Sequence, residues 1–332
     1  MSDLDTYKQN RINENINIFN NSVSRLYYNT VSKINYIRTT RQTNRVKQNQ
    51  INYVVNKFYV DYNILKTELD KSILSIKNYV PTTLTINKNK KALLIGINYT
   101  GTSNELYGCI NDANSIKDRI SKEGFNDIIV LTDHTTQKAT KSNILKEFTN
   151  LLVNSQEGDL LFLSYSGHGS YALDKNGDEK TGYDQLIVPC DLNMIVDDEL
   201  KTIIQNNLKP NVTLFAMFDS CFSGSVLDLR YQYMDSLNYN KFTENNKQLE
   251  TKGHVFMISG CHDYQTSVDA FINNKSTGAM TWSLLEALKQ TPHCTWRELV
   301  INMRDLLKTS QYEQIPQFSC GTFENIDSTV FI

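Results

Sequence analysis

Two residues that could carry nucleophilic chemistry stand directly after apolar runs of the chain. His168 lies between two glycines after the run 160–165, and Cys221 follows an Asp-Ser pair after the run 212–218. Short apolar runs of this kind predict buried parallel strands, whose carboxyl ends meet at one edge of a sheet. An imidazole can take the proton of a nearby thiol and later return it to a leaving amine. The pair therefore predicts a cysteine hydrolase.

The elements that must position this pair form an alternating pattern from residue 90 onward, which is typical of an α/β sandwich around a mostly parallel sheet. A polar stretch at 238–252 interrupts the pattern and is expected to be an exposed loop. We assign 81–332 to one domain. Strands are expected over 92–97, 128–131, 160–165, 185–189, 212–218, 255–259 and 328–332, and helices over 111–123, 142–152, 197–205, 279–290 and 295–307.

Residues 1–80 have a different character, because they contain neither glycine nor proline. Apolar residues recur there at spacings of three and four over 12–37 and over 51–76, which predicts two amphipathic helices. The basic polar stretch 38–50 is expected to separate them. Two interpretations remain open: a helical hairpin that only packs on the body of the protein, and a removable, regulatory pro-segment.

The formal net charge of −2 argues against a general nucleic-acid binder, but it conceals an asymmetry. Residues 1–80 hold 12 Lys and Arg against 6 Asp and Glu, whereas residues 81–332 hold 22 against 30. One hypothesis is that a Lys or Arg from 38–57 occupies an acidic cleft as a pseudosubstrate. The competing interpretation is an ordinary solvated helix face.

Targeting and membrane signals are not evident. The N-terminus has no apolar signal-peptide core, and no stretch approaches the roughly 20 apolar residues of a membrane span. The six cysteines are scattered without C-x-x-C spacing, so we interpret them as reduced thiols rather than zinc ligands or disulfides. We expect a cytoplasmic monomer that contacts neither membrane nor nucleic acid.

Four motifs carry a resemblance to a known family. They read Gly-Cys-x-Asn-Asp-Ala at 108–113, Tyr-Ser-Gly-His-Gly at 165–169, Asp-Ser-Cys-x-Ser-Gly at 219–224 and Ile-Ser-Gly-Cys-x-Asp-x-Gln-Thr-Ser at 258–267. In this order they resemble the metacaspases of type I, which are caspase-related cysteine peptidases of clan CD. The resemblance covers residues 90–332 and implies a caspase-like fold with endopeptidase activity. Residues 1–80 have no part in it.

The resemblance also implies roles for individual residues. Cys221 would be the nucleophile and His168 its acid/base partner, with the backbone N–H groups of Gly169 and Cys221 as the oxyanion site. Metacaspases cleave after Arg or Lys, and the matching pocket positions are Cys109, Asp112, Ser166 and Asp219. A carboxylate there can bind a guanidinium or an ammonium group. An ordinary helix N-cap is the alternative for Asp112.

Many metacaspases need calcium, and four acids match the calcium site of the family: Asp184, Asp197, Asp198 and Asp228. Ca²⁺ takes six to eight oxygen ligands, often with several carboxylates. The alternative for Asp197 and Asp198 is a helix start favoured by the helix dipole and reinforced by Glu199. The calcium-like segment 174–178 does not begin an EF-hand loop, because the required glycine position holds Glu179 and the twelfth position holds Gln185, and it is interpreted as a turn.

Self-cleavage in the 238–252 loop is expected after Lys241, Lys247 or Lys252, which would make the protein a latent or self-processing zymogen.

Phe222 stands where metacaspases usually carry His after the catalytic cysteine. The rivals are a catalytically silent caspase-like interaction module, a legumain-like peptidase, which the missing secretory signal disfavours, and a calcium-independent, Arg-specific paracaspase-like peptidase.

Overall fold

The computed structural model describes residues 3–78, 89–174, 182–221, 226–233, 243–245, 250–260, 269–272, 275–322, 324, 326 and 328–332. The chain divides into two compact units, residues 1–82 and residues 83–332. Each unit is described by itself. Within the described part of the chain, no helix combines the length and the apolar character needed to cross a membrane.

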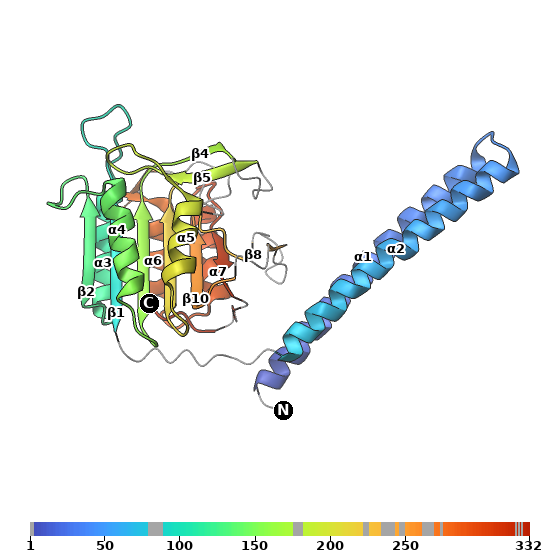
Figure 1. Ribbon diagram of the computed structural model, residues 1–332, viewed down its shortest axis with the longest axis horizontal. Helices are drawn as coiled ribbons and strands as arrows, with labels where there is room; N and C mark the ends of the chain where they lie inside the picture. Colours follow the sequence, from blue (N-terminus) through green and yellow to red (C-terminus); the bar gives the residue numbers. More distant parts are fainter. Residues whose placement is uncertain are drawn as a thin grey trace. The chain divides into compact units, whose positions relative to one another are not determined.

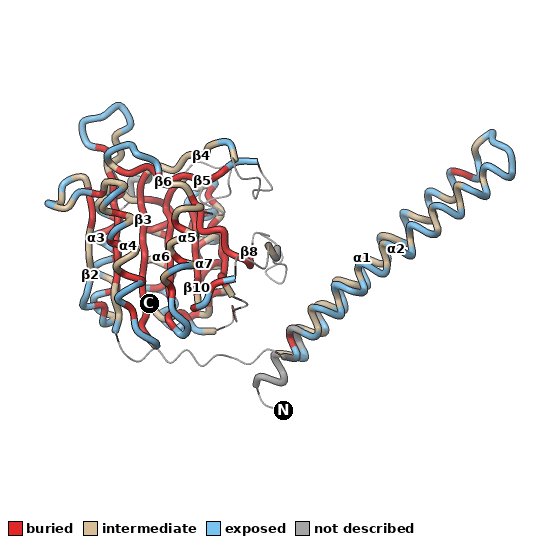
Figure 2. The backbone as a smooth tube through the Cα atoms, viewed as in Figure 1, coloured by how far each residue is buried: buried red, intermediate tan, exposed pale blue. Residues whose placement is uncertain are grey.

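The first unit is an antiparallel pair of long helices, α1 (Asp3–Thr39) and α2 (Asn44–Asn78) (Figure 1). The rings of Phe19 in α1 and Tyr62 in α2 contact each other across the pair, 5.9 Å between centroids, whereas Ile16 and Leu74 of the predicted apolar stripes are exposed. Among the described side chains of the pair, only those of Ile37 and Ile76 are buried (Figure 2). The expectation that 38–50 separates the helices is wrong: the chain leaves the helical conformation only at 40–43. Because 38–50 contains no glycine or proline, nothing in it stops α2 from beginning at Asn44.

The second unit is built on a sheet in the strand order β2-β1-β3-β7-β10-β13-β8-β9. The pairs from β2 to β10 are parallel, and the pairs from β10 to β9 are antiparallel. The bounds are β1 Lys90–Gly96, β2 Asp127–Thr132, β3 Leu160–Ser166, β7 Thr213–Asp219, β8 Tyr231–Tyr233, β9 Thr243–Glu244, β10 His254–Ser259 and β13 Gln317–Cys320.

Helices cover both faces of this sheet (Figure 1). Successive strand residues point to opposite faces, so Leu94 packs with α3, α6 and α7 on one face, whereas Leu93 packs with α4 and α5 on the other. The helices are α3 Cys109–Lys122, α4 Lys141–Val153, α5 Asp197–Asn207, α6 Ala279–Gln290 and α7 Trp296–Thr309. The strands between them are buried almost throughout (Figure 2). The α/β sandwich with a mostly parallel central sheet and an N-terminal helical segment is thus confirmed.

Two expected strands differ in the structure. The strand expected at 185–189 is β5 (Tyr183–Ile187), which pairs with β4 (Gly169–Leu173) and β6 (Ile195–Val196) in a separate antiparallel sheet. The strand expected at 328–332 does not form. That segment contributes an isolated bridge between Thr295 and Thr329, and β13 takes the place beside β10. Both errors arise because apolar content predicts burial but does not specify which strands pair.

Smaller elements were not predicted from the sequence. In addition to β4, β6 and β13, they include β11 (Asp269–Ile272) and β12 (Lys275–Gly278), which form a hairpin that leads into α6. Most of the polar stretch 238–252 lies outside the described residues. Within it, β9 pairs with β8, and the buried Arg230 forms an ion pair with Glu250.

Candidate active site

The register of β3 and β7 places the predicted nucleophile and base opposite each other. Ser166 and Asp219 are partners at the last position of this parallel pair. His168 and Cys221 each stand two residues beyond that position, so both lie at the carboxyl edge of the sheet. The proximity that the sequence predicted therefore follows from one strand pairing.

His168 is held by its backbone and by its ring. Its N–H donates to the hydroxyl of Tyr99 (2.8 Å), and its carbonyl accepts from the hydroxyl of Tyr165 (2.7 Å). The ring of Tyr99 lies 4.6 Å from the imidazole, centroid to centroid. His168 Nε2 lies 2.7 Å from the carbonyl oxygen of Asn104, which can only accept. Nε2 therefore carries a proton in the neutral ring, and Nδ1 is the nitrogen left to accept one.

Tyr99 itself adopts a left-handed backbone conformation, with φ of 53°, that is uncommon for an aromatic residue. Its hydroxyl donates to the carbonyl of Val188 (2.6 Å) and lies 3.2 Å from the hydroxyl of Tyr165. Burial is the largest cause that raises the pKa of Tyr99 well above its usual range, so the hydroxyl stays protonated. These contacts fix the segment that carries the histidine.

Cys221 is partly exposed, as a nucleophile that meets a substrate must be. The backbone of Gly169 packs directly against it: a methyl group on Gly169 would overlap the carbonyl oxygen of Cys221. Glycine is therefore required at position 169 by close approach. This packing brings together the backbones of the two residues expected to bind an oxyanion. Phe222, the departure from the family pattern, lies outside the described residues.

Two buried carboxylates, Asp112 and Asp219, lie beside this edge. Asp112 accepts hydrogen bonds from the end of β12, and Asp219 accepts them from the start of α6. Asp112 accepts from the hydroxyl of Thr277 (2.6 Å) and from the N–H of Gly278 (3.0 Å). Asp219 accepts from both the N–H (2.9 Å) and the hydroxyl (2.8 Å) of Thr281.

Gly278 shows how close the two carboxylates are. A methyl group on it would overlap the Asp219 carboxylate and would lie 2.9 Å from Asp112 Oδ2. Burial, and then the charge of Asp219, raise the pKa of Asp112 to about 7. Near neutral pH the carboxyl group of Asp112 is therefore partly protonated, and a nearby cation favours its ionised form.

The other predicted pocket residues differ in how they relate to this pair. The hydroxyl of Ser166 donates to Asp112 Oδ2 (2.7 Å), so Ser166 belongs to the carboxylate cluster. Cys109 is buried and lies near Tyr99, whose pKa its thiol helps to raise. The alternative role of Asp112 as a helix N-cap is wrong: Gly108 caps α3, and Asp112 lies inside the first turn.

Acidic residues gather at a second place, where α5 begins. Asp197, Asp198 and Asp228 each present a carboxylate oxygen within 4.8 Å of the others. Burial, followed by the charge of Asp228, raises the pKa of Asp197 to about 7, and Asp184 is near enough to raise it further. The ammonium group of Lys201 lies 3.3 Å from Asp198 Oδ1 and 3.3 Å from Asp228 Oδ2.

The helix-start interpretation of Asp197 and Asp198 also holds. Both lie in the first turn of α5, and Glu199 accepts a hydrogen bond from the N–H of Val196 (3.1 Å). Asp228 adopts a left-handed backbone conformation, with φ of 46°, that aspartate tolerates better than most residues. Asp174 closes the β4–β5 hairpin through its N–H to the carbonyl of Gly182 (3.0 Å), and the remainder of the segment 174–178 lies outside the described residues.

Sequence reasoning missed the supporting residues. They act through a ring contact, a hydroxyl or the main chain, and none stands in a motif that predicts its partner. These residues are Tyr99, Asn104, Thr277, Gly278, Thr281 and Lys201. The one signal in the sequence was the position of Tyr99 two residues after the first predicted strand, at the same edge as His168.

Comparisons with known proteins identify the family. A model of the metacaspase peptidase C14 domain matches residues 90–230. Metacaspase-1 of Meyerozyma guilliermondii is 35% identical over 69% of this chain and 69% of its own length. Metacaspase-1 of Scheffersomyces stipitis is 36% identical, over 70% of each chain. A solved structure of a protein from Geobacter sulfurreducens superposes with a TM-score of 0.55 at 25% identity, over 72% of this chain and 95% of its own.

The fold and the cysteine–histidine edge define a peptidase of the caspase-like class. The chain belongs to the metacaspase family, and its enzymatic class is therefore that of a cysteine peptidase, a hydrolase.

Proposed function

We propose that this metacaspase cleaves proteins and peptides after Arg or Lys, as a monomer, through Cys221 and His168. The observation that supports this specificity is the buried carboxylate pair, Asp112 and Asp219, beside the edge that carries the dyad. A guanidinium or ammonium group of the substrate would bring a positive charge next to this pair. An acidic substrate side chain would instead add a third negative charge in a buried site.

The proposed chemistry is acyl transfer. His168 Nδ1 takes the proton of the Cys221 thiol, and the thiolate attacks the carbonyl carbon of the scissile bond. The N–H groups of Gly169 and Cys221 bind the oxyanion that forms. His168 returns the proton to the leaving amine, which departs as the thioester remains. Water, activated by the same imidazole, then hydrolyses the thioester and frees Cys221.

A calcium site at Asp184, Asp197, Asp198 and Asp228 fits the donor set, because carboxylate oxygens are the ligands that Ca²⁺ prefers. Burial, and then repulsion by the neighbouring carboxylate of Asp228, raise the pKa of Asp197. When bound, the ion would supply charge neutralisation at the start of α5. The ammonium group of Lys201 already provides part of this neutralising positive charge through its contacts with Asp198 and Asp228.

Latency and self-processing belong to the same proposal. Lys252 is exposed, but its neighbours Thr251 and Gly253 are buried, and the Thr251 hydroxyl donates to the Gly253 carbonyl (2.7 Å). A peptidase needs an extended, accessible segment, so this environment favours Lys241 or Lys247 as the cleavage site; both lie outside the described residues. Mass spectrometry of the protein incubated with Ca²⁺, beside Cys221→Ala, tests this. A Cys221-dependent cut after one of the three lysines supports processing.

Latency has a separate test. If a Lys or Arg of 38–57 acts as a pseudosubstrate, deletion of residues 1–80 raises the rate of cleavage of an Arg peptide. An unchanged rate rules out that role for the segment.

The central test is a fluorogenic peptide series that differs only in the residue before the scissile bond: Arg, Lys, Asp or Asn. Cleavage of the Arg and Lys peptides alone, dependent on Ca²⁺ and lost in Cys221→Ala and in His168→Ala, is the expected result. Cleavage after Asp, or cleavage that persists in Cys221→Ala, would falsify the proposal. Arg cleavage without any calcium dependence favours the paracaspase-like alternative, and no cleavage favours the silent interaction module.

A further inference from the structure

The helical hairpin of the first unit carries its charges unevenly. Between residues 15 and 60, which form the half nearer the turn, there are seven Lys and Arg and no Asp or Glu. The acidic residues of the hairpin all lie in the other half, at 3–14 and 61–70. The net charge of −2 for the whole chain describes neither this half nor the body, so the expectation of no nucleic-acid contact, which was drawn from that net charge, does not apply to this half. We call residues 15–60 the distal half.

The cations of the distal half are directed to solvent. Arg25, Lys33, Arg38, Arg41 and Arg45 are all exposed. Within the described part of the chain, the hairpin ion pair that involves the distal half is the one between Lys57 and Asp61. The amino group of Lys47 donates to the carbonyl of Arg38 (2.9 Å), which adds a further cation at the turn. The distal half is thus a positively charged surface that contains no acidic residue of its own.

Exposed aromatic rings accompany these charges. Tyr27, Tyr28, Tyr36, Tyr53 and Tyr59 are between 55% and 73% exposed. An exposed tyrosine presents a flat face for stacking and a hydroxyl for hydrogen bonding, without the cost of exposing a purely apolar ring.

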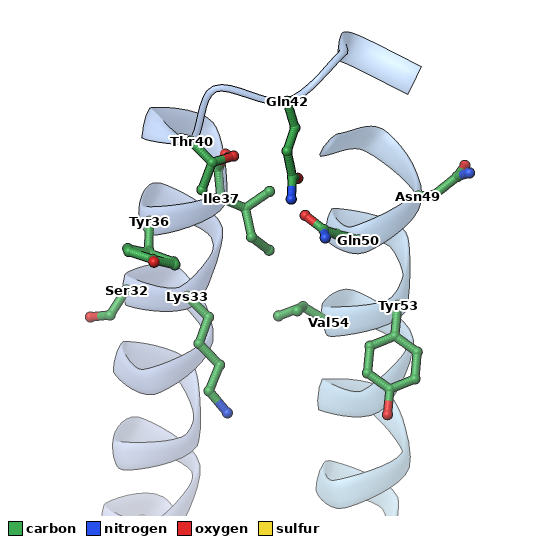
Figure 3. Close-up of a pocket in the computed structure, with 10 residues that line it drawn as sticks. All are labelled: Ser32, Lys33, Tyr36, Ile37, Thr40, Gln42, Asn49, Gln50, Tyr53 and Val54. Atoms are coloured by element: carbon green, nitrogen blue, oxygen red, sulfur yellow. The ribbon is translucent and has the colours of Figure 1, made fainter. Parts of the chain in front are cut away.

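A groove lies between the two helices next to the turn, with a volume of about 800 Å³ (Figure 3). Ile37 and Val54 point toward each other across it, and the amides of Gln42 and Gln50 point into it from the turn side. Its lining residues are Ser32, Lys33, Tyr36, Ile37, Thr40, Gln42, Asn49, Gln50, Tyr53 and Val54. The groove therefore offers an apolar floor, amides that can both donate and accept, two tyrosines and one cation.

We propose that the distal half of the hairpin binds single-stranded nucleic acid, with a base in or beside this groove and phosphates on the surrounding cations. Lys and Arg neutralise phosphates, tyrosines stack on unpaired bases, and side-chain amides bond to base edges. Single strands are favoured over a duplex because stacking on a side chain requires a base face that duplex pairing hides.

Other polyanions fit the same surface less well. A membrane-bound helix needs one wide apolar face, but Tyr27 and Tyr28 are neighbours that point about 100° apart around α1. The mixture of tyrosines with amides also differs from the aliphatic contacts that an acidic amphipathic helix would need. The test separates these partners directly.

The experiment measures fluorescence anisotropy of a labelled oligouridine of about 20 nucleotides with the full-length protein, in a Cys221→Ala background that prevents self-cleavage. The charge variant is R38Q/R41Q/R45Q. Its matched control is K66Q/K71Q/K77Q, which removes the same charge from exposed positions in the other half. Circular dichroism checks that every variant keeps its helix content.

The charge variant is expected to bind at least about tenfold more weakly and to lose about 2 units of slope in a plot of log affinity against log salt, while the control stays near the parent protein. Tyr36→Ala/Tyr53→Ala is expected to weaken binding by about fivefold or more, whereas Tyr36→Phe/Tyr53→Phe retains it. Equal loss in both charge variants, no effect of the tyrosine-to-alanine change, or equal affinity for a duplex overturns the proposal. So does tighter binding to phosphatidylserine vesicles or to polyglutamate than to the oligonucleotide.

Discussion

Ser166 and Asp219 are register partners at the last position of β3 and β7. His168 and Cys221 therefore each lie two residues beyond the same position of the sheet. The relationship depends on main-chain pairing alone, so small changes of the backbone at this edge should affect catalysis more than stability.

Gly169→Ala tests this dependence on the backbone. The added methyl group overlaps the carbonyl oxygen of Cys221, so the backbone of one of the two residues must move. We expect kcat/KM for an Arg peptide to fall by about 100-fold or more, because a shift of about 1 Å near the reacting groups has that effect. Ser170→Ala, at the next position of β4, is the control and should keep most of the activity. Normal activity in Gly169→Ala would show that the close approach is not needed.

The pH dependence of specificity should report the state of Asp112. The pKa of this carboxyl, raised to about 7, means that it gains a proton as the pH falls through neutrality and loses its attraction for a guanidinium. An Arg peptide and its citrulline isostere would react at the same His168 and Cys221, so the titration of these two residues cancels in the ratio of the two kcat/KM values. We expect the ratio to fall as the pH is lowered through about 7.

Asp112→Asn should remove this pH dependence and lower the ratio by about tenfold or more. The folded-state pKa of Asp112 lies above the unfolded value, so the protonated form favours folding and the ionised form opposes it. The stability that protonated Asp112 contributes is therefore lost as the pH rises through about 7. The variant should therefore melt no lower than the parent at pH 8. Asp118→Asn, an exposed change on the same helix, is the matched control. A ratio that still titrates in Asp112→Asn would contradict the assignment.

Tyr99 should act as a positioning residue for His168. Tyr99→Phe keeps the ring against the imidazole but removes the hydroxyl that accepts from the His168 N–H and donates to the Val188 carbonyl. Loss of buried hydrogen bonds costs about 1–3 kcal/mol. We expect kcat to fall by about tenfold with KM nearly unchanged.

Tyr107→Phe, at an exposed position, should leave both constants unchanged. A shifted midpoint of the kcat profile against pH in Tyr99→Phe separates an effect on the histidine from a loss of folded protein. A loss of melting temperature with an unaltered kcat profile would indicate a purely structural role.

Calcium should raise the melting temperature of the protein. Neutralising Asp197, Asp198 and Asp228 relieves their repulsion, and saturation at about 100 times the dissociation constant contributes about 2.7 kcal/mol, equivalent to roughly 5–10 °C for a unit of this size. Asp197→Asn should abolish the increase, whereas Asp127→Asn, at an exposed strand end, should retain it. An identical increase with Mg²⁺, or its persistence in Asp197→Asn, argues against the site.

Lys201 should compete with the ion. Its ammonium group contacts Asp198 and Asp228, so Lys201→Met removes a competing positive charge and should tighten calcium binding by several-fold. Without calcium the same variant should melt at a lower temperature, because the carboxylates are left less neutralised. Lys201→Arg keeps the charge and serves as the control. Isothermal titration calorimetry gives the affinity, and weaker binding in Lys201→Met would mean that the lysine supports the site.

The sequence by itself determined the class of fold and predicted the two residues of the proposed dyad. Runs such as 160–165 and 212–218 are apolar at every position except Ser164 and Thr213, which is typical of a strand buried on both faces, and the glycines around His168 leave room for a reacting ring. The helices of the first unit were equally predictable from their spacing. These properties are local in the chain, and local patterns can be read without knowing what lies opposite.

The tertiary structure alone decided what surrounds the dyad. β12 and the start of α6 are distant in sequence from Asp112, yet Thr277, Gly278 and Thr281 donate hydrogen bonds to the two carboxylates. The place of β13 beside β10 and the ammonium of Lys201 between two aspartates depend on pairings across the fold. Burial and nearby charge, which set the pKa of Asp112, are sums over neighbours that folding brings together, and no stretch of sequence contains them.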